Sequence, residues 1–173
     1  MPPTAPSIDV LVLMGSDSDF DTMSKCHALL DELKIPHEIH VASAHRTPAR
    51  VLDLVADAER RNVKCFICAA GLAAHLAGVV AAHTTRPVIG VPMPGGIGDG
   101  LDALLSTVQM PPGIPVATVG VGSGGAGAKN AAVLASQIIA LSDPALAKRI
   151  ADWRIAQSEQ VLAKDAKLQE KLQ

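Results

Sequence analysis

Aromatic side chains are almost missing from this sequence. Its 173 residues include two Phe, one Trp and no Tyr, so aromatics make up 2% of the chain. Proteins that bind single-stranded nucleic acid by stacking use rows of aromatic rings, and this sequence does not supply such a row. The formal net charge of −2 provides no basic surface for a nucleic-acid backbone either. We therefore expect no nucleic-acid partner.

Long apolar runs are absent as well. No segment reaches the roughly 18 consecutive apolar residues of a transmembrane helix. The opening residues MPPTAPSIDV lack the basic-then-apolar order of a secretory signal peptide. The three cysteines are an odd number, which suits a reducing compartment. A cytoplasmic location without membrane association is the resulting expectation.

The sequence shows no recognisable metal-ligand spacing. Cys65 and Cys68 form a CxxC, but they lie in the apolar segment VKCFICAAG. If that segment is a strand, residues three apart point to opposite faces, so a pair of buried thiols is favoured over a metal or redox pair. The six histidines are scattered, and His37 and His40 are expected on opposite faces of one strand. We therefore predict no metal site.

What the sequence does contain is a regular alternation of apolar strand patterns and helix patterns. This alternation predicts βαβ units, a parallel sheet and helices on both of its faces, with right-handed crossovers. The length favours one domain, residues 1–173, with a core at about 8–143 and a helical arm at about 144–173. The strands are predicted at 8–15, 37–43, 64–71, 87–93 and 114–122, and the core helices at 20–33, 48–60, 72–83, 101–108 and 128–141.

The arm is predicted as a long amphipathic helix that starts at Pro144. Leu146, Ile150 and Trp153 form an apolar stripe, which continues thinly toward the C-terminus. A helix of about 28 residues is roughly 42 Å long, which exceeds what a domain of this size can cover. A frayed, solvated helix is one interpretation. We favour an arm that packs on a neighbouring subunit.

Polar and glycine-rich segments follow the predicted strands. They are GSDSD at 15–19, SAHRTP at 43–48, AAGLAAHLAG at 69–78 and PGGIGDG at 94–100. Ligands of open parallel sheets bind beyond the carboxyl ends of the strands. If the strands have the spatial order 2-1-3-4-5, the first three of these loops are neighbours. A ligand site is therefore expected there.

The GSDSD loop suits an anionic or ribose-containing ligand. Gly15 permits a tight turn, and the hydroxyls of Ser16 and Ser18 precede a predicted helix, whose N-terminus attracts anions. Asp19 can accept hydrogen bonds from a ribose diol or can simply cap the helix. The loop is neither a GxGxxG fingerprint nor a GxxxxGK[ST] P-loop, so NAD and ATP find no specific support.

The next two loops add acid–base and anion-binding groups. Arg46 offers a planar cation for a phosphate, and His45 can exchange protons near neutral pH. AAGLAAH places several backbone amides close together, as an anion nest requires. His75 is either a partly buried helix residue or a direct participant. Thr47 and Pro48 are expected to cap and open the following helix. These residues predict a small phosphorylated metabolite, proton transfer by His45 and no cofactor.

Taken together, several motifs resemble one family in order and spacing. MGSDSD, SAHRTP, AAGLAAHLAG, GVPM, DALLSTVQMPPGIPVATVG and AKNAAVLA resemble the N5-carboxyaminoimidazole ribonucleotide mutases of purine biosynthesis, across about residues 8–143. The resemblance implies a three-layer α/β/α fold with a flavodoxin-like sheet of order 2-1-3-4-5. It also implies a homo-octamer with sites at subunit boundaries. The family moves a carboxylate from an exocyclic nitrogen to ring carbon 4 of its ribonucleotide, without metal, biotin or ATP.

The resemblance also assigns roles to individual residues. His45 matches the catalytic histidine. Leu72 and Ala77 depart from the Gly and Pro of many bacterial members, and a sister class carboxylates aminoimidazole ribonucleotide directly with carbon dioxide, so that activity is the alternative. A transient contact with the enzyme that makes the unstable substrate is a further expectation. Substrate contacts are implied for Ser16, Asp17, Asp19, Ser43, Arg46, Ala70, Gly71 and Leu76, with Gly15, Ser18 and His75 as additional candidates.

Overall fold

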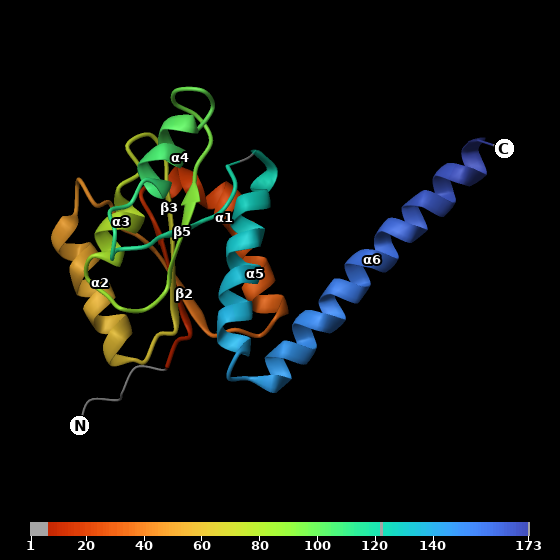
Figure 1. Cartoon of the computed structure of the whole chain (residues 1–173), viewed down its shortest axis with the longest axis horizontal. Coiled ribbons are helices and arrows are strands. Elements are labelled where there is room, and N and C mark those ends of the chain that lie inside the picture. The colour runs from red at the N-terminus through yellow and green to blue at the C-terminus, as the bar shows by residue number, and fades with distance from the viewer. Residues whose placement is uncertain (1–6, 122, 173) are drawn as a thin grey trace.

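The computed structural model describes residues 7–121 and 123–172. Within them, five parallel strands form one sheet in the order β2-β1-β3-β4-β5, as predicted (Figure 1). Adjacent strands are in register along their length, so their carboxyl ends reach the same edge of the sheet. The strands are β1 (Val10–Met14), β2 (His37–Val41), β3 (Cys65–Ala70), β4 (Val88–Pro92) and β5 (Ala117–Thr118).

Helices cover both faces of the sheet and make the predicted three layers. One face packs against α1 and α5 and the start of α6, and the other packs against α2 and α3. Two short 3-10 helices, Asp17–Asp19 and Ser123–Gly125, precede α1 and α5. The α-helices are α1 (Phe20–Glu32), α2 (Pro48–Arg60), α3 (Leu76–Ala81), α4 (Leu101–Val108), α5 (Ala126–Ala140) and α6 (Pro144–Leu172).

Alternation along each central strand divides the core into two apolar clusters. In β1, Val10 and Val12 face α1 and α5, whereas Leu11 and Leu13 face α2 and α3. All five β1 residues are buried, so this strand reads as a continuous apolar run, as expected for a sheet covered on both faces.

The CxxC cysteines follow the same alternation. Cys65 belongs to one cluster and Cys68 to the other, which confirms that the two thiols do not converge. Both are free and buried. Burial raises the pKa of the Cys65 thiol to about 12, so it is a protonated core residue rather than a nucleophile or metal ligand.

Two predicted elements are shorter than the sequence indicated, whereas the other bounds of the core elements agree within two residues. The helix predicted at 72–83 starts only at Leu76, because Leu72 has a left-handed backbone with φ of 55°, which a helix cannot include. The strand predicted at 114–122 has only Ala117 and Thr118 in ladder pairing. Pro115 has no amide to donate, and residue 122 lies outside the described residues.

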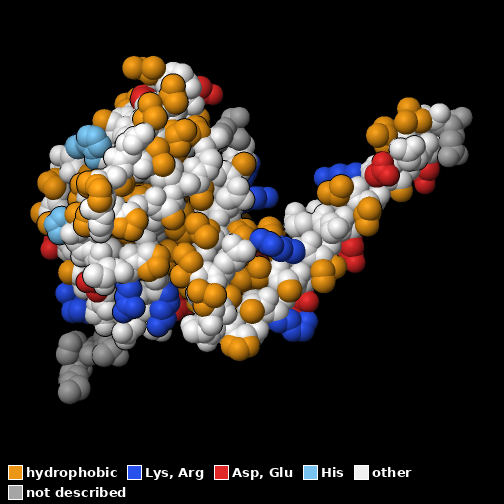
Figure 2. All heavy atoms as spheres, in the orientation of Figure 1, with side chains coloured by type: hydrophobic (Ala, Val, Ile, Leu, Met, Phe, Trp, Pro, Cys, Tyr) orange, Lys and Arg blue, Asp and Glu red, His pale blue; other side chains and the backbone are white. Residues whose placement is uncertain are grey.

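Helix α6 confirms the long helix predicted from Pro144, while its packing on a neighbouring subunit stays a prediction. Leu146 and Ile150 are buried in the core and Trp153 packs partly against it, while Arg149 Nε donates a hydrogen bond to Leu33 O at 3.0 Å. Beyond them the helix projects away from the sheet (Figure 1), and both apolar and charged side chains lie along it (Figure 2). Within the described ranges, no helix combines the length and apolarity needed to cross a membrane.

Candidate functional site

A hollow of about 670 Å³ lies at the carboxyl ends of β1 to β4. Loops from four strands line it, which places one site where the strand order predicts it. Eleven of the twelve predicted residues line the hollow, and Asp17 does not. The eleven are Gly15, Ser16, Ser18, Asp19, Ser43, His45, Arg46, Ala70, Gly71, His75 and Leu76.

The loop after β1 is organised by a capping box. Ser16 N donates to Asp19 Oδ2 at 3.2 Å, and Ser18 N donates to Ser16 Oγ at 3.4 Å. Asp19 therefore caps a helical turn, which is one of the two roles that the sequence predicted for it. Burial raises the pKa of its carboxyl, although the bond from Ser16 opposes this. Asp17 accepts hydrogen bonds from Ser18 N and Ser16 Oγ, so it shapes the loop from outside the hollow.

Arg46 joins the loop after β2 to the loop after β1. Its Nη2 donates to Gly15 O at 2.8 Å, and its own backbone amide donates to Ser43 Oγ at 3.2 Å. Thr47 occupies the N-cap position of α2, and Pro48 lies in the first turn. The prediction that the Thr47 side chain caps the helix is wrong, because it makes no capping hydrogen bond. Its hydroxyl instead accepts from Ser43 N and donates to Ser43 O, so it closes the turn that presents His45 and Arg46.

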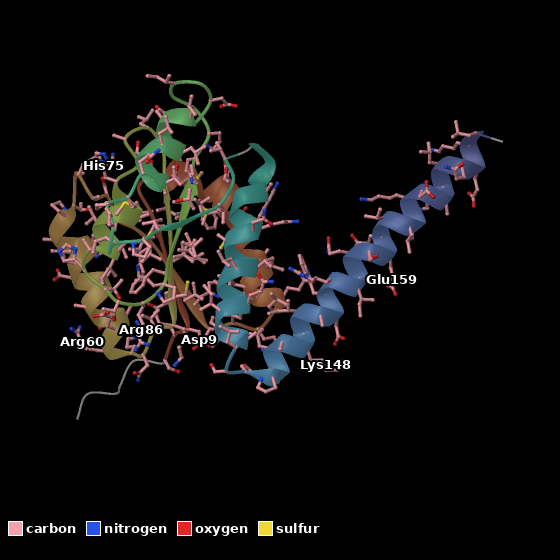
Figure 3. The ribbon with its side chains drawn as sticks, in the orientation of Figure 1. Asp9, Arg60, His75, Arg86, Lys148 and Glu159 are labelled. Atoms are coloured by element: carbon pink, nitrogen blue, oxygen red, sulfur yellow. The ribbon has the colours of Figure 1, made fainter. Side chains whose placement is uncertain are left out.

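His45 and His75 form a pair inside the hollow. His45 Nε2 lies 2.9 Å from His75 Nδ1, and the rings meet edge to face at an interplanar angle of 82°. At this distance one of the two nitrogens carries a proton and donates it in a hydrogen bond to the other. Both residues are exposed to the hollow. In Figure 3, His75 lies at the upper end of the core, whereas Asp9, Arg60 and Arg86 lie at the lower end.

The loop after β4 completes the rim, which the sequence only partly indicated. Met93 N donates to Ala70 O at 2.9 Å, and this bond ties the loop to β3. Ser106 Oγ donates to Leu72 O at 3.4 Å, so α4 supports the loop that carries His75. The strand order, with β4 beside β3, is the signal that could have found these residues. The lining residues that were missed are Ala44, Leu72, Ala73, Met93, Pro94, Gly95 and Gly96.

The expectation of scattered histidines is wrong at one place. His27, Asp31 and His37 lie together, with potential ligand atoms within 4.8 Å of one another. They sit at the amino end of β2, away from the hollow. His40 instead contacts Glu38, consistent with the predicted opposite orientation of His37 and His40.

The fold and the hollow define the class of protein. A parallel sheet of order 2-1-3-4-5 between two helical layers, with a polar hollow at the strands' carboxyl ends, is a flavodoxin-like architecture. Ligands of such folds bind at the carboxyl ends of the strands. The family model described as AIR carboxylase matches residues 9–160. The chain therefore belongs to the AIR carboxylase family, in agreement with the motif resemblance.

Named relatives cover nearly the whole chain. A Methanocaldococcus jannaschii protein named N5-carboxyaminoimidazole ribonucleotide mutase is 48% identical over 161 residues, which are 93% of this chain and 98% of that protein. The Mycobacterium tuberculosis H37Rv protein of the same name is 48% identical over 169 residues, 98% and 95% of the two chains. The crystal structure of Treponema denticola PurE superposes with a TM-score of 0.82 at 31% identity, covering 92% and 97%.

Proposed function

We propose that this enzyme interconverts N5-carboxyaminoimidazole ribonucleotide and 4-carboxy-5-aminoimidazole ribonucleotide in purine biosynthesis. The proposal rests on the His45–His75 pair, 2.9 Å apart in the same hollow as Arg46. Relatives nearly half identical over almost their whole length carry the mutase name. A titratable pair beside a fixed cation suits proton transfer on an anionic ribonucleotide.

In this proposal, His45 acts first as an acid and then as a base. It gives a proton to the exocyclic nitrogen, the bond from nitrogen to the carboxylate breaks, and carbon dioxide is released with the amine left neutral. Ring carbon 4 then attacks the carbon dioxide and forms the new carbon–carbon bond. His45 takes the proton from that tetrahedral carbon, which restores the aromatic ring and the starting state of the enzyme. No proton is gained or lost overall, and the same proposed steps can run in the opposite order.

His75 is the proposed positioning partner of His45. For the first step His45 has to be in its imidazolium form, and His75 Nδ1, which lies 2.9 Å from His45 Nε2, can accept a hydrogen bond from that form. Because the contact fixes the ring of His45 relative to α3, it also reduces the freedom of the ring before substrate binds. Keeping both reacting fragments in place is worth up to roughly 7–11 kcal/mol of barrier in well-oriented cases.

The remaining rim residues are proposed to hold the ribonucleotide. Ser16, Ser43 and Arg46 offer hydroxyls and a guanidinium for the phosphate, and Asp19 offers a carboxylate for the ribose. The half-buried state of Asp19 suits a group that exchanges a cap for ligand hydroxyls. Ala70, Gly71 and Leu76 also line the hollow, and their small or apolar groups suit the base and a neutral gas.

Retention of carbon dioxide requires a cover over the hollow. In one chain, His45, His75 and Leu72 are all exposed. We propose that neighbouring copies in a homo-octamer supply that cover. The proposed reaction takes place in the cytoplasm and uses no catalytic metal or organic cofactor. A transient contact with the preceding enzyme is proposed to deliver the labile substrate.

Direct carboxylation of aminoimidazole ribonucleotide with carbon dioxide is the second candidate, because the matching family is described as AIR carboxylase. One assay separates the two. Purified protein is given either the N-carboxylated ribonucleotide or aminoimidazole ribonucleotide plus bicarbonate, and formation of the C4-carboxylated product is followed. We expect turnover of the first at limiting carbon dioxide. Rapid product formation only from the second, in proportion to dissolved carbon dioxide, would establish the carboxylase instead.

A further inference from the structure

The structure brings three potential metal ligands together at the end of the sheet opposite the hollow. His27 and Asp31 lie four residues apart on the same face of α1. His37 is the first residue of β2 and pairs with Val10 of β1. The turn between α1 and β2 is fixed by bonds from Lys34 N to Asp31 O and from Ile35 N to Leu30 O. The three side chains are therefore held by rigid elements rather than by a loose loop.

His37 has the hydrogen bonding of a preset metal ligand. Its Nδ1 lies 2.7 Å from Ile35 O, and because a carbonyl oxygen only accepts, Nδ1 carries the proton. The lone pair of neutral His37 is then on Nε2, and the side chain is only 5% exposed. A histidine that ligates a metal commonly donates its other ring N–H to a backbone carbonyl in this way.

The other two side chains complete the arrangement. His27 Nδ1 lies 2.7 Å from His37 Nε2, and His27 Nε2 lies 3.5 Å from Asp31 Oδ2. Asp31 Oδ1 lies 4.0 Å from His37 Nε2. One carboxylate oxygen thus faces the nitrogen pair, while the other can accept a bond from the outer nitrogen of His27.

We propose that His27, Asp31 and His37 bind a divalent zinc ion through His27 Nδ1, His37 Nε2 and Asp31 Oδ1. Zinc takes such nitrogen and oxygen ligands tetrahedrally at about 2.0–2.2 Å, which sets two ligating nitrogens about 3.3 Å apart. The two rings therefore have to separate by about 0.6 Å from their present contact to admit the ion. His27 and Asp31 have side chains 44% and 62% exposed, so they can move and solvent can fill the fourth position.

Such an ion would fasten the C-terminal end of α1 to the start of β2. The three ligands would be two neutral imidazoles and one carboxylate. Zinc accepts such a set more readily than magnesium or calcium, because those two ions prefer oxygen ligands. The partial negative charge at the C-terminus of α1 also favours a cation there. Because the ion would bind the folded chain, it would raise the melting temperature by mass action.

Zinc titration of the full-length, chelator-treated protein tests this site. Calorimetry with zinc chloride is run on the wild type, on His27→Gln and Asp31→Asn, and on the control His40→Gln, which removes an imidazole from β2 but not from the cluster. We expect His27→Gln and Asp31→Asn to lose one zinc equivalent per chain, or to bind it at least about tenfold more weakly. His40→Gln is expected to match the wild type.

A second readout separates binding at this cluster from zinc binding elsewhere. Zinc should raise the melting temperature of the wild type and of His40→Gln, and this rise should be lost in His27→Gln. Because His27 and Asp31 are largely exposed, both variants are expected to fold. Equal zinc uptake and equal thermal response in the wild type and in both cluster variants would overturn the proposal, and so would a wild type that takes up no zinc.

Discussion

His45 Nε2 and His75 Nδ1 lie 2.9 Å apart, although the two residues are 30 positions apart in the sequence and follow different strands. Only β1 lies between β2 and β3 in the sheet. The loops that follow β2 and β3 therefore meet above β1, which brings the two histidines into contact. In such a contact one ring nitrogen donates a proton and the other accepts it. Neither residue can therefore be changed without altering the state of the other.

Replacing the members of this pair should affect turnover unequally. We expect His45→Asn to lower kcat by 10³-fold or more, because the acid and base of both steps are lost. His75→Asn should lower kcat by about 10- to 100-fold and change the shape of the pH–rate profile, with ligand binding largely retained. The control is His83→Asn, whose ring bonds Val79 O at the far end of α3. Equal kinetics for His75→Asn and His83→Asn would remove His75 from the mechanism.

Arg46 should contribute to substrate binding rather than to chemistry. Its guanidinium already donates to Gly15 O, so it is oriented toward the loop that is proposed to hold the phosphate. Arg46→Ala should raise KM by about tenfold or more and change kcat little, since a charge-assisted bond is worth about 1.5–3 kcal/mol. Arg50→Ala, an exposed change in the first turn of α2, the helix that follows the loop of Arg46, is the matched control. A loss confined to kcat would contradict this assignment.

Gly127 should be intolerant of any side chain. A Cβ at this position would overlap Gly120 O, a backbone atom that cannot rotate away. Gly127→Ala should lower the free energy of unfolding by about 2 kcal/mol or more, as overpacking against rigid neighbours does. Gly120→Ala serves as the control, because a Cβ there meets nothing within 4 Å. Urea unfolding compares the two variants, and similar midpoints would show that α5 can shift at no cost.

Arg61 should stabilise the protein mainly above acidic pH. Its hydrogen bonds hold the pKa of Glu38 and that of Asp57 below their ordinary values. A lowered carboxyl pKa gives stability that is present above the ordinary pKa and is lost as the pH falls through the folded-state value. Arg61→Met should therefore cost about 1 kcal/mol at pH 7, since the carboxylates are partly exposed.

The cost of Arg61→Met should shrink as the pH falls below the ordinary pKa values of the two carboxyls, which urea unfolding at pH 7 and near pH 3 can measure. Arg60→Met is the control, because Arg60 is 69% exposed and its ion pair with Asp57 is on the surface. It should change stability by a few tenths of a kcal/mol at most. A deficit for Arg61→Met that is the same at both pH values would rule out the carboxylates as its cause.

Deleting residues 154–173 should leave the core folded and lower the oligomer order. The buried side chains of α6, Leu146 and Ile150, precede the cut, whereas Ile155, Val161, Leu162, Leu168 and Leu172 are exposed apolar residues beyond it. Light scattering measures the mass, and thermal unfolding measures the stability. A truncated protein with unchanged mass and unchanged melting would refute the arm as an intersubunit contact.

The fold was predictable from the sequence because buried strands and amphipathic helices differ in period. The two elements that are shorter than predicted, α3 and β5, depend on backbone conformation. The spacing of apolar residues along the sequence does not reveal that conformation. Leu72 adopts a left-handed conformation that shortens α3, and Pro115 limits β5. Both positions look regular in an apolar pattern.

The site was predictable where polar loops follow strands, and less so where the lining is apolar. Met93 and Gly95 line the hollow without any side-chain chemistry to mark them. Asp17 looked equivalent to Asp19, but the 3-10 turn directs only Asp19 into the hollow. His27 and His37 are brought together by the turn at Lys34, a relation that spacing along the chain does not show.

The two outer strands have a consequence for how copies of this chain can meet. β5 pairs through only two residues and follows Pro115, while β2 carries Glu38 in an ion pair with Arg61. Edge strands that are short, flanked by proline or charged discourage the pairing of a strand from another copy. We therefore expect self-association to proceed through helical surfaces, and we expect ordered assemblies of fixed size rather than fibrils that lengthen one strand at a time.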